Sequence, residues 1–448
     1  MNSQAGIKFL FILALLSVLL LGGLICFDFV MSHHKLPPNS FVGNINISRM
    51  TKKEVIYKLK NSAITELSPS SITLIISSNE TFSFFPREFG VYILAEKTAD
   101  SIFSLPEISN YFLNLRDRFS RDYHVFNLAL AILPEKTRDI LFEVSQQVDA
   151  PAINAKIELE ESSGKYHIYP DSPKRKLNIE KTLEIIRKTL ARGDKAIKAE
   201  IEYSFDQKIK ESDLRRSPPV NRISSFTTYF GAHDSPNRIH NIKLIASWLD
   251  NTLMMSGEIL SLTEKIGDFS PQRGFRQAYV ISNNELVPEY GGGTCQIATT
   301  LYNTVALADI KVLARRNHSF YFNIYPLGRD ATVYPGSADF KFQNDTGYPI
   351  LIKATATNHK LSFRIYGTPS SKEVVFSGAS IYSMGGNGAF KATSYKRVIG
   401  SNAPFRTVVK RTVIDKNTKE IITEEIIRSY YKLYGDGANV PIKRRESR

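Results

Sequence analysis

Residues 289–303 read EYGGGTCQIATTLYN, the densest cluster of unusual residues in the chain. Apolar side chains recur from Ile297 to Ala308 at the spacing of one face of an α-helix. Thr294 can cap the start of that helix, and three glycines give the preceding loop unusual backbone freedom. The stretch therefore predicts a glycine loop that runs into an amphipathic helix, with Cys295 in the first turn of the helix.

The position of Cys295 suits a nucleophile. Unpaired N–H groups and the positive end of the helix dipole stabilise a thiolate in the first turn and lower the pKa of the thiol. Backbone N–H groups there can also stabilise an oxyanion, and glycines let a ligand approach the backbone closely. The residues that we expect to bind a ligand are Gly291, Gly292, Gly293, Thr294, Gln296, Asn303 and Arg329.

A histidine and two acidic residues follow Cys295 along the chain. His318 comes just before a segment of strand character, and Asp330 and Asp339 come after it. Papain-like and NlpC-type hydrolases show the same order of cysteine, histidine and acid. One interpretation is a catalytic set in which Cys295 is the nucleophile, His318 the base and Asp330 the acid that orients the histidine. Asp339 is the alternative acid. The other interpretation is a small packed cysteine and a hydrogen-bonded structural histidine.

The composition indicates a folded protein with an anionic partner. Of the 448 residues, 42% are hydrophobic and 23% charged, so the chain is long enough for two or three domains. Its net charge is +14, which favours anionic lipids, anionic envelope polymers or nucleic acid. No motif that binds nucleic acid is visible, so we expect no nucleic-acid partner. No metal-ligand spacing is visible either, and we expect neither a metal nor a cofactor.

The N-terminal segment has the properties of a membrane anchor. Residues 9–27 are uncharged, and at a rise of about 1.5 Å per residue they come close to the thickness of the hydrocarbon core of a bilayer. No small-x-small site follows, which disfavours a cleaved signal peptide, and Ile25 before Cys26 disfavours a lipoprotein. Positive charge precedes the run. We expect a cytoplasmic N-terminus at 1–8, an anchor at 9–30 and the bulk of the chain outside the cytoplasm.

Two segments with the pattern of small α+β lobes follow the anchor. The first contains a capping box at Thr51–Glu54, and the second contains a helix that Asn178 can cap. Their similar order of strands and helices fits either an internal duplication or two unrelated lobes. Ser217, Pro218 and Pro219 then lie in a charged stretch that is typical of a linker.

The C-terminal stretch is rich in strand-forming residues. Residues 406–414 and 421–431 alternate between apolar and polar side chains, and residues 415–418 between them favour a turn. This pattern predicts a β-hairpin, which we interpret as an appendage to the preceding domain.

Residues 223–367 resemble the VanW family, and the upstream lobes resemble the YoaR-like region that is proposed to bind peptidoglycan. The family usually has Phe-Ser-Phe-Asn where residues 260–263 read Leu-Ser-Leu-Thr. The resemblance implies a place in the cell envelope and a connection to peptidoglycan, but no mechanism. The motifs that carry it are SFTTY, NRIHNI, SGEILS, RGFRQA, EYGGGTCQIATTLYN, NHSF, GRDATV, DFKFQN and YPILI.

The expected fold is α+β. It comprises an N-terminal transmembrane helix, two small α+β lobes in 36–207, a mixed α/β VanW domain in 221–367 and a β-rich extension in 372–434. Three functions are compatible with this organisation. The first is a membrane-anchored extracytoplasmic protein that binds peptidoglycan, its precursors or other anionic envelope polymers. The second is a cysteine peptidase or transpeptidase that acts on peptidoglycan stem peptides, and the third is a scaffold for envelope-assembly enzymes.

Overall fold

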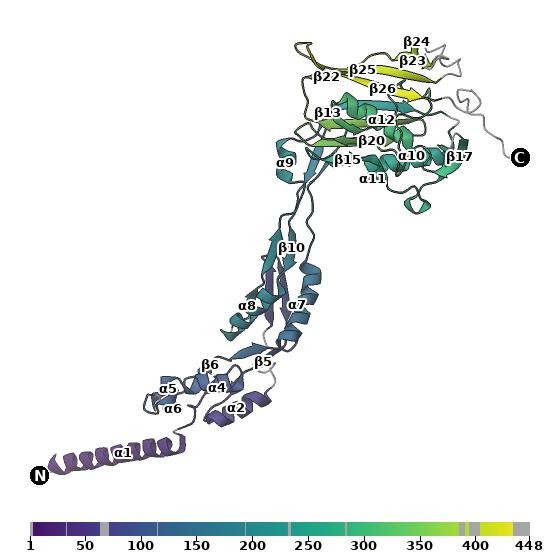
Figure 1. Ribbon diagram of the computed structural model, residues 1–448. Coiled ribbons are helices and arrows are strands. Elements are labelled where there is room, and N and C mark those ends of the chain that lie inside the picture. The colour runs from purple at the N-terminus through teal and green to yellow at the C-terminus, as the bar shows by residue number, and fades with distance from the viewer. Residues whose placement is uncertain are drawn as a thin grey trace. The chain divides into compact units, whose positions relative to one another are not determined.

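The computed structural model is mixed in helix and strand, which confirms the expected α+β class (Figure 1). The chain clusters into two compact units. The first holds Met1–Ile153 and Pro173–Asp206, and the second holds Asn154–Ser172 and Gln207–Arg448. Residues 1, 2, 433 and 434, which fall in the expected end segments, lie outside the described residues. The structure describes residues 3–32, 34–62, 71–113, 115–192, 194–231, 234–282, 285–384, 390–393 and 404–432.

The apolar N-terminal run forms one continuous helix, α1 (Ser3–Ser32). Within it, Lys8–Met31 has the length and composition needed to cross a membrane. Its large apolar side chains are exposed, Leu16 for example by 60%. Apart from its last turns, which contact the segment around Tyr111, the helix is apolar and exposed on all sides, the form expected of a segment that lipid surrounds or of a signal sequence.

The first core of unit 1 is built around two helices. Helix α2 (Lys52–Asn61) starts at the expected capping box, in which Thr51 and Glu54 each accept a backbone N–H of the other. It packs against α4 (Ala95–Phe103). The short elements of this region are β1 (Ser40–Val42), β2 (Ile45–Asn46), β6 (His124–Phe126), α5 (Pro106–Ser109) and α6 (Leu115–Phe119).

The second core of unit 1 joins strands that are far apart in the sequence. Strands β3 (Ile72–Ser77) and β4 (Glu80–Phe84) form a hairpin, and β11 (Ala196–Lys198) pairs with β3 in parallel. The two expected lobes are therefore interleaved rather than consecutive. The other elements of this core are α7 (Pro134–Val148), α8 (Ile179–Ala191), the pair β5 (Val91–Ile93) and β7 (Leu130–Ile132), and the pair β10 (Lys174–Leu177) and β12 (Ile201–Ser204).

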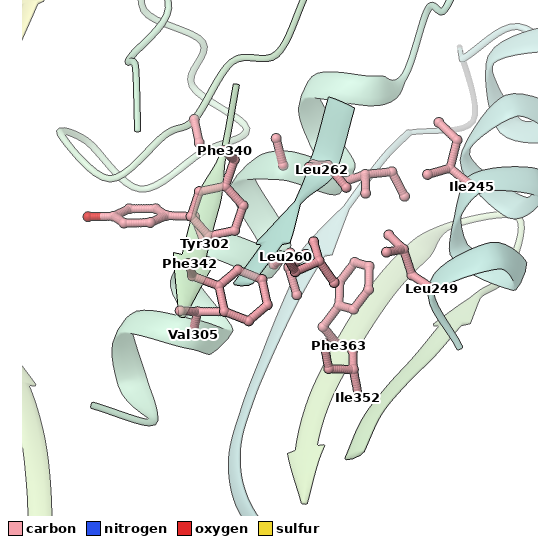
Figure 2. Packing of buried hydrophobic residues seen from close by; sticks show 14 of the residues in the cluster. Ile245, Leu249, Leu260, Leu262, Tyr302, Val305, Phe340, Phe342, Ile352 and Phe363 are labelled. Atoms are coloured by element: carbon pink, nitrogen blue, oxygen red, sulfur yellow. The ribbon is translucent and has the colours of Figure 1, made fainter. Parts of the chain in front are cut away.

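Unit 2 is built on an antiparallel sheet in the order β13-β21-β20-β14. Its strands are β13 (Asn221–Tyr229), β14 (Thr252–Met254), β20 (Ile350–Ala356) and β21 (Lys360–Gly367). Helices α10 (Pro236–Leu249) and α12 (Thr294–Leu307) pack on this sheet. Figure 2 shows Phe363 and Ile352 of the sheet close to Leu249 of α10. This core fixes the start of α12, where Cys295 lies.

A hairpin from earlier in the chain packs against the same sheet. It consists of β8 (Lys156–Leu159) and β9 (Tyr166–Tyr169), and it shares a small core with α9 (Glu211–Arg216), Leu351 and Tyr366. The side chain of Glu161, in the turn of the hairpin, accepts two hydrogen bonds from Arg364. Residues 154–172, which the sequence grouped with the upstream lobes, therefore cluster with unit 2.

Smaller elements complete unit 2. Strands β15 (Ile259–Ser261), β19 (Lys341–Gln343) and β18 (Lys311–Ala314) form one sheet in that order. Helix α11 (Leu262–Ile266), a short 3-10 turn (Pro271–Arg273) and the hairpin β16 (Gln277–Ser282) with β17 (Glu285–Tyr290) lie between the longer elements in sequence.

The C-terminal strands form a separate sheet that is attached to α12. The expected hairpin is confirmed as β25 (Phe405–Asp415) and β26 (Ile421–Tyr431). Arg411 of β25 donates to the carbonyl of Ala306 and pairs with Asp309, which ties the hairpin to the end of α12. The remaining strands are β22 (Lys372–Phe376), β23 (Ser380–Met384) and β24 (Phe390–Thr393).

Candidate functional site

The glycine loop before α12 is shaped by packing. Gly291 and Gly293 have φ angles of +100° and +105°, a region that side chains rarely adopt. A Cβ on Gly291 would overlap the ring of Phe269, and a Cβ on Gly292 would lie 2.6 Å from the Cβ of Ala278. The three glycines therefore allow the loop to pass close to neighbouring side chains, which accounts for their presence without a bound ligand.

Cys295 lies in the first turn of α12, as the sequence predicts. The N-cap is Gly293 rather than the expected Thr294, whose hydroxyl instead donates to the carbonyl of Gly291. The Sγ atom of Cys295 lies 3.2 Å from Oγ1 of Thr332 and 3.8 Å from the carbonyl oxygen of Val333. The thiol is half-buried and is held by polar neighbours, so its environment is not that of a cysteine packed among hydrocarbon.

His318 lies beside Cys295 in a buried position. Its Nδ1 donates to Oδ2 of Asp330 at 2.6 Å, and its backbone N–H donates to the same oxygen at 2.7 Å. The ring stacks on Tyr325 and meets the edge of Phe322, with centroids 5.5 and 5.0 Å apart. Because Asp330 engages Nδ1, Nε2 is the ring nitrogen that remains available to Cys295, whose charge raises the pKa of His318.

The strand expected after His318 does not form. Residues 319–325 lie in turns and irregular backbone, and Tyr325 donates its N–H to the carbonyl of Phe322. Two of the aromatic residues that suggested a strand, Phe322 and Tyr325, instead contact the imidazole of His318, which the local pattern could not distinguish from strand pairing.

The charges of the site favour a thiolate next to an imidazolium. Burial alone would raise the pKa of Cys295, but the charge of His318 and hydrogen bonds from His318 and Thr332 lower it to about 7. Burial alone would lower the pKa of His318, but the charge of Cys295 and the hydrogen bond to Asp330 raise it to about 9. Between these values Cys295 and His318 form an ion pair, which is the reactive state of a thiol nucleophile.

Asp330 is held by residues on both sides. Tyr431 of β26 donates to Oδ1 of Asp330 at 2.6 Å, and Arg315 lies 3.5 Å from the same oxygen. Arg315 also donates through Nε to the backbone carbonyl of Asp330. Burial opposes the charge of Asp330, but the hydrogen bond and charge of His318, followed by Tyr431, keep the pKa of the carboxyl below its usual range. No local pattern in the sequence points to Tyr431, because nothing near it in the chain links it to Asp330.

Asp339, the alternative acid, has a different place. Its carboxylate accepts the hydroxyl of Ser261 at 2.6 Å and the N–H of Thr263 at 3.0 Å. It therefore supports the start of α11 and does not contact His318. Of the two acids considered, the structure brings Asp330 alone to the imidazole.

Gln296 belongs to a polar chain at the start of α12. Its Oε1 accepts from Arg238 at 2.6 Å, and its Nε2 donates to the hydroxyl of Thr228 at 3.0 Å. Arg238 in turn pairs with Asp234 at 2.9 Å. The side chain of Gln296 is fully buried, so it positions the helix start and Arg238 rather than offering a free amide to a ligand.

Asn303 and Arg329 are the other two residues expected to bind a ligand. Asn303 lies further along α12 than Cys295, and Arg329 lies in the segment that carries Asp330. Asn303 is buried and donates to the carbonyl of Arg329 at 2.8 Å. The guanidinium of Arg329 lies over the ring of Phe376 at 4.4 Å and near that of Phe226 at 5.8 Å. Both residues thus join α12 to the chain segment that carries Asp330, and Arg329 also lines an open groove of about 670 Å³.

Two known families match separate segments of the chain. Residues 237–366 match the family "VanW like protein", and residues 82–198 match the family "Putative peptidoglycan binding domain". The chain is 33% identical over 158 residues to "Uncharacterized protein YoaR" of Bacillus subtilis (strain 168), a match that covers 35% of this chain and 52% of that protein. No solved structure matches the chain.

A second relative carries a name that refers to antibiotic resistance. It is the "Vancomycin B-type resistance protein VanW" of Enterococcus faecalis (strain ATCC 700802 / V583), 23% identical over 169 residues, which cover 36% of this chain and 62% of that protein. The chain thus spans between half and two thirds of the two curated relatives. The two family matches indicate a protein of the cell envelope. We conclude that the chain carries a VanW-like domain downstream of a domain that matches the putative peptidoglycan-binding family.

Proposed function

We propose that this protein is a cysteine-dependent enzyme that cleaves or exchanges amide bonds in the stem peptides of peptidoglycan. The observation that supports this proposal is that His318, hydrogen-bonded to Asp330 at 2.6 Å, is close enough to Cys295 for its charge to lower the pKa of the thiol. Nucleophilic acyl transfer requires a nucleophile, a base and a group that orients the base. Here the nucleophile, Cys295, also lies at a helix start. A purely structural role for Cys295 has no need of a buried histidine held by a buried carboxylate.

The proposed acyl transfer begins from the thiolate of Cys295 and the imidazolium of His318. The thiolate of Cys295 attacks the carbonyl carbon of the amide, and a tetrahedral oxyanion forms. The imidazolium of His318 gives its proton to the leaving amine as the C–N bond breaks, and a thioester remains on Cys295. Neutral His318 then takes a proton from water, which releases a carboxylic acid, or from an acceptor amine, which forms a new amide. Asp330 holds the imidazole by Nδ1 throughout.

The start of α12 supplies a donor for the oxyanion. The N–H groups of Thr294 and Gln296 donate to Gly291 and Gly293. The N–H of Cys295 lies between them in the first turn, where the helix itself has no acceptor for it. This N–H is adjacent to the attacking sulfur, which is the position that an oxyanion donor takes in acyl-transfer enzymes.

The upstream domain is the basis for the proposed substrate. It matches a peptidoglycan-binding family, and the chain as a whole carries a net charge of +14. We infer that residues 82–198 hold the wall polymer while the VanW domain acts on its peptides. With α1 as an uncleaved anchor, both domains lie on the extracytoplasmic side of the membrane, where peptidoglycan is found.

The proposal is tested with the full chain in detergent and purified peptidoglycan. Hydroxylamine is added because it converts a thioester into a hydroxamate. Mass spectrometry should detect stem peptides that have lost a residue or gained a hydroxamate, and Cys295→Ala should abolish both products. Asp339→Asn, outside the catalytic set, serves as the matched control and should retain them.

The same assay distinguishes the catalytic function from a second candidate function, binding to the cell wall. If the chain sediments with peptidoglycan but yields no altered peptide and no adduct on Cys295, the catalytic proposal is wrong. A wall-binding role, which the match of residues 82–198 favours, then remains.

A further inference from the structure

The end of the apolar helix α1 is fixed to a specific segment of unit 1. The hydroxyl of Tyr111 donates to Oδ2 of Asp28 at 2.8 Å, and Arg118 lies 3.9 Å from the same oxygen. Phe29 packs edge-on against Tyr111 and stacks on Phe112, with centroids 5.0 and 6.1 Å apart. The segment around α5 and α6 therefore cannot move far from the end of α1.

The length of α1 determines how deep in the membrane its contact with the segment around Tyr111 lies. Its apolar part, Lys8–Met31, has 24 residues, which span about 36 Å at a rise of about 1.5 Å per residue. The hydrocarbon core of a bilayer is about 30 Å thick. Asp28 and Phe29 lie within the last turn of this part and so reach the interface between hydrocarbon and headgroups when α1 crosses a membrane.

The attached segment exposes large apolar side chains. Phe112 is 70% exposed, Leu113 62% and Phe119 62%. These three side chains, which we call the juxtamembrane patch, lie within one or two residues of Tyr111 and Arg118, the two contacts of Asp28. Basic side chains next to the patch, Arg116 and Arg121, are also exposed.

We propose that the juxtamembrane patch inserts into the lipid interface beside α1, so that unit 1 rests on the membrane through a second contact. Aromatic side chains favour this interface, and arginine complements anionic headgroups. The proposal is independent of catalysis, but it rests on the proposed anchor. Its consequence is that the first core is held at the membrane surface rather than at the end of a free tether.

Fluorescence quenching tests the depth of the patch. In the full chain, Trp248→Phe removes the one native tryptophan. Single tryptophans are then introduced as Phe112→Trp and Phe119→Trp, and the protein is reconstituted in vesicles of brominated phosphatidylcholine with phosphatidylglycerol. Both positions should lose much of their emission compared with vesicles of unbrominated lipid.

Two controls make each outcome decisive. Leu16→Trp, in the middle of α1, must be quenched if α1 is inserted. Phe142→Trp on α7, where the native side chain is 57% exposed, should retain its emission. Quenching at position 16 alone would overturn the proposal for the patch. Quenching at position 142 as strong as that at positions 112 and 119 would indicate general adsorption to the vesicles and would also overturn it. No quenching at Leu16 would overturn the anchor and the patch together.

Discussion

The hydroxyl of Tyr431 donates a hydrogen bond of 2.6 Å to Oδ1 of Asp330, which lies 101 residues earlier in the chain. Tyr431 is fully buried at the end of β26, outside the segment that matches the VanW family. Arg315 reinforces the connection, because it contacts Asp330 and also donates to Ser429 of β26. The C-terminal sheet is therefore a support of the candidate site and not the appendage that the sequence suggested.

Tyr431→Phe should destabilise unit 2 without removing any member of the catalytic set. A hydrogen bond to a charged group contributes about 1.5–3 kcal/mol, and the buried carboxylate of Asp330 loses one such bond. We expect the melting temperature measured by circular dichroism at pH 7 to fall by several degrees. The folded state holds the pKa of Asp330 below its usual value, so this contribution is present above the unfolded pKa and is lost as pH falls.

The deficit of Tyr431→Phe should therefore stay constant down to the pKa of an unfolded aspartate and shrink only as the pH falls below it, toward the lowered pKa of Asp330 in the folded state. Tyr229→Phe is the matched control, because Tyr229 is 67% exposed and its substitution should leave the melting temperature unchanged. Equal melting temperatures for Tyr431→Phe and the native chain would show that the hydrogen bond contributes nothing.

Asp330→Asn should lower the reactivity of Cys295, whereas Asp339→Asn should not. The amide of asparagine retains the shape of the carboxylate but loses the charge that stabilises the imidazolium, so the thiolate loses its partner. By analogy with the same substitution of the acid in a Ser-His-Asp triad, turnover should fall by about 10⁴-fold. Asp339→Asn weakens the start of α11 and should cost about 1 kcal/mol of stability with full thiol reactivity. Similar losses of reactivity in both variants would contradict the assignment of Asp330.

Two glycine variants separate the stability cost of close packing from the cost of backbone strain. Gly291→Ala places a Cβ on the ring of Phe269 and adds left-handed strain, whereas Gly336→Ala adds the strain alone, because nothing lies within 4 Å of a Cβ there. We expect Gly336→Ala to cost about 1–2 kcal/mol and Gly291→Ala about 1–3 kcal/mol more. Chemical unfolding followed by circular dichroism measures the difference. Equal costs would mean that the loop relaxes around the added methyl group, and that the space beside Gly291 is not tightly filled.

The sequence predicted the parts of the site that depend on local pattern. The apolar spacing after Cys295 and the glycines before it predicted a helix start, and α12 begins within one residue of the expected position. The capping box at Thr51 and the hairpin at 415–418 were predicted for the same reason, since each is specified by neighbouring residues.

Contacts between distant residues were not predictable in this way. Asp330 and Asp339 are equivalent in the sequence, and they differ only because Asp339 meets Ser261 and Thr263 in the fold. The role of Tyr431 depends on how the C-terminal sheet packs. The close packing of the glycine loop was not predictable either, because the ring of Phe269 that fills the space beside Gly291 comes from a separate part of the chain. That the glycines bind a ligand stays a prediction.

The pH dependence of alkylation tests the ion pair directly. In a Cys26→Ala background, the rate of reaction of Cys295 with iodoacetamide should rise to half of its maximum at about pH 7, because the pKa of the thiol is lowered to about that value. The imidazolium that lowers it persists up to about pH 9, so it is present throughout the rise. His318→Ala removes this charge, and the midpoint should move up toward the value of about 8.5 for a free thiol. His240→Ala is the control, since His240 contacts the carbonyl of Gly274 and should leave the midpoint in place. A midpoint near that of a free thiol in the native chain, or one that His318→Ala does not move, would mean that Cys295 and His318 are neighbours without being a catalytic pair.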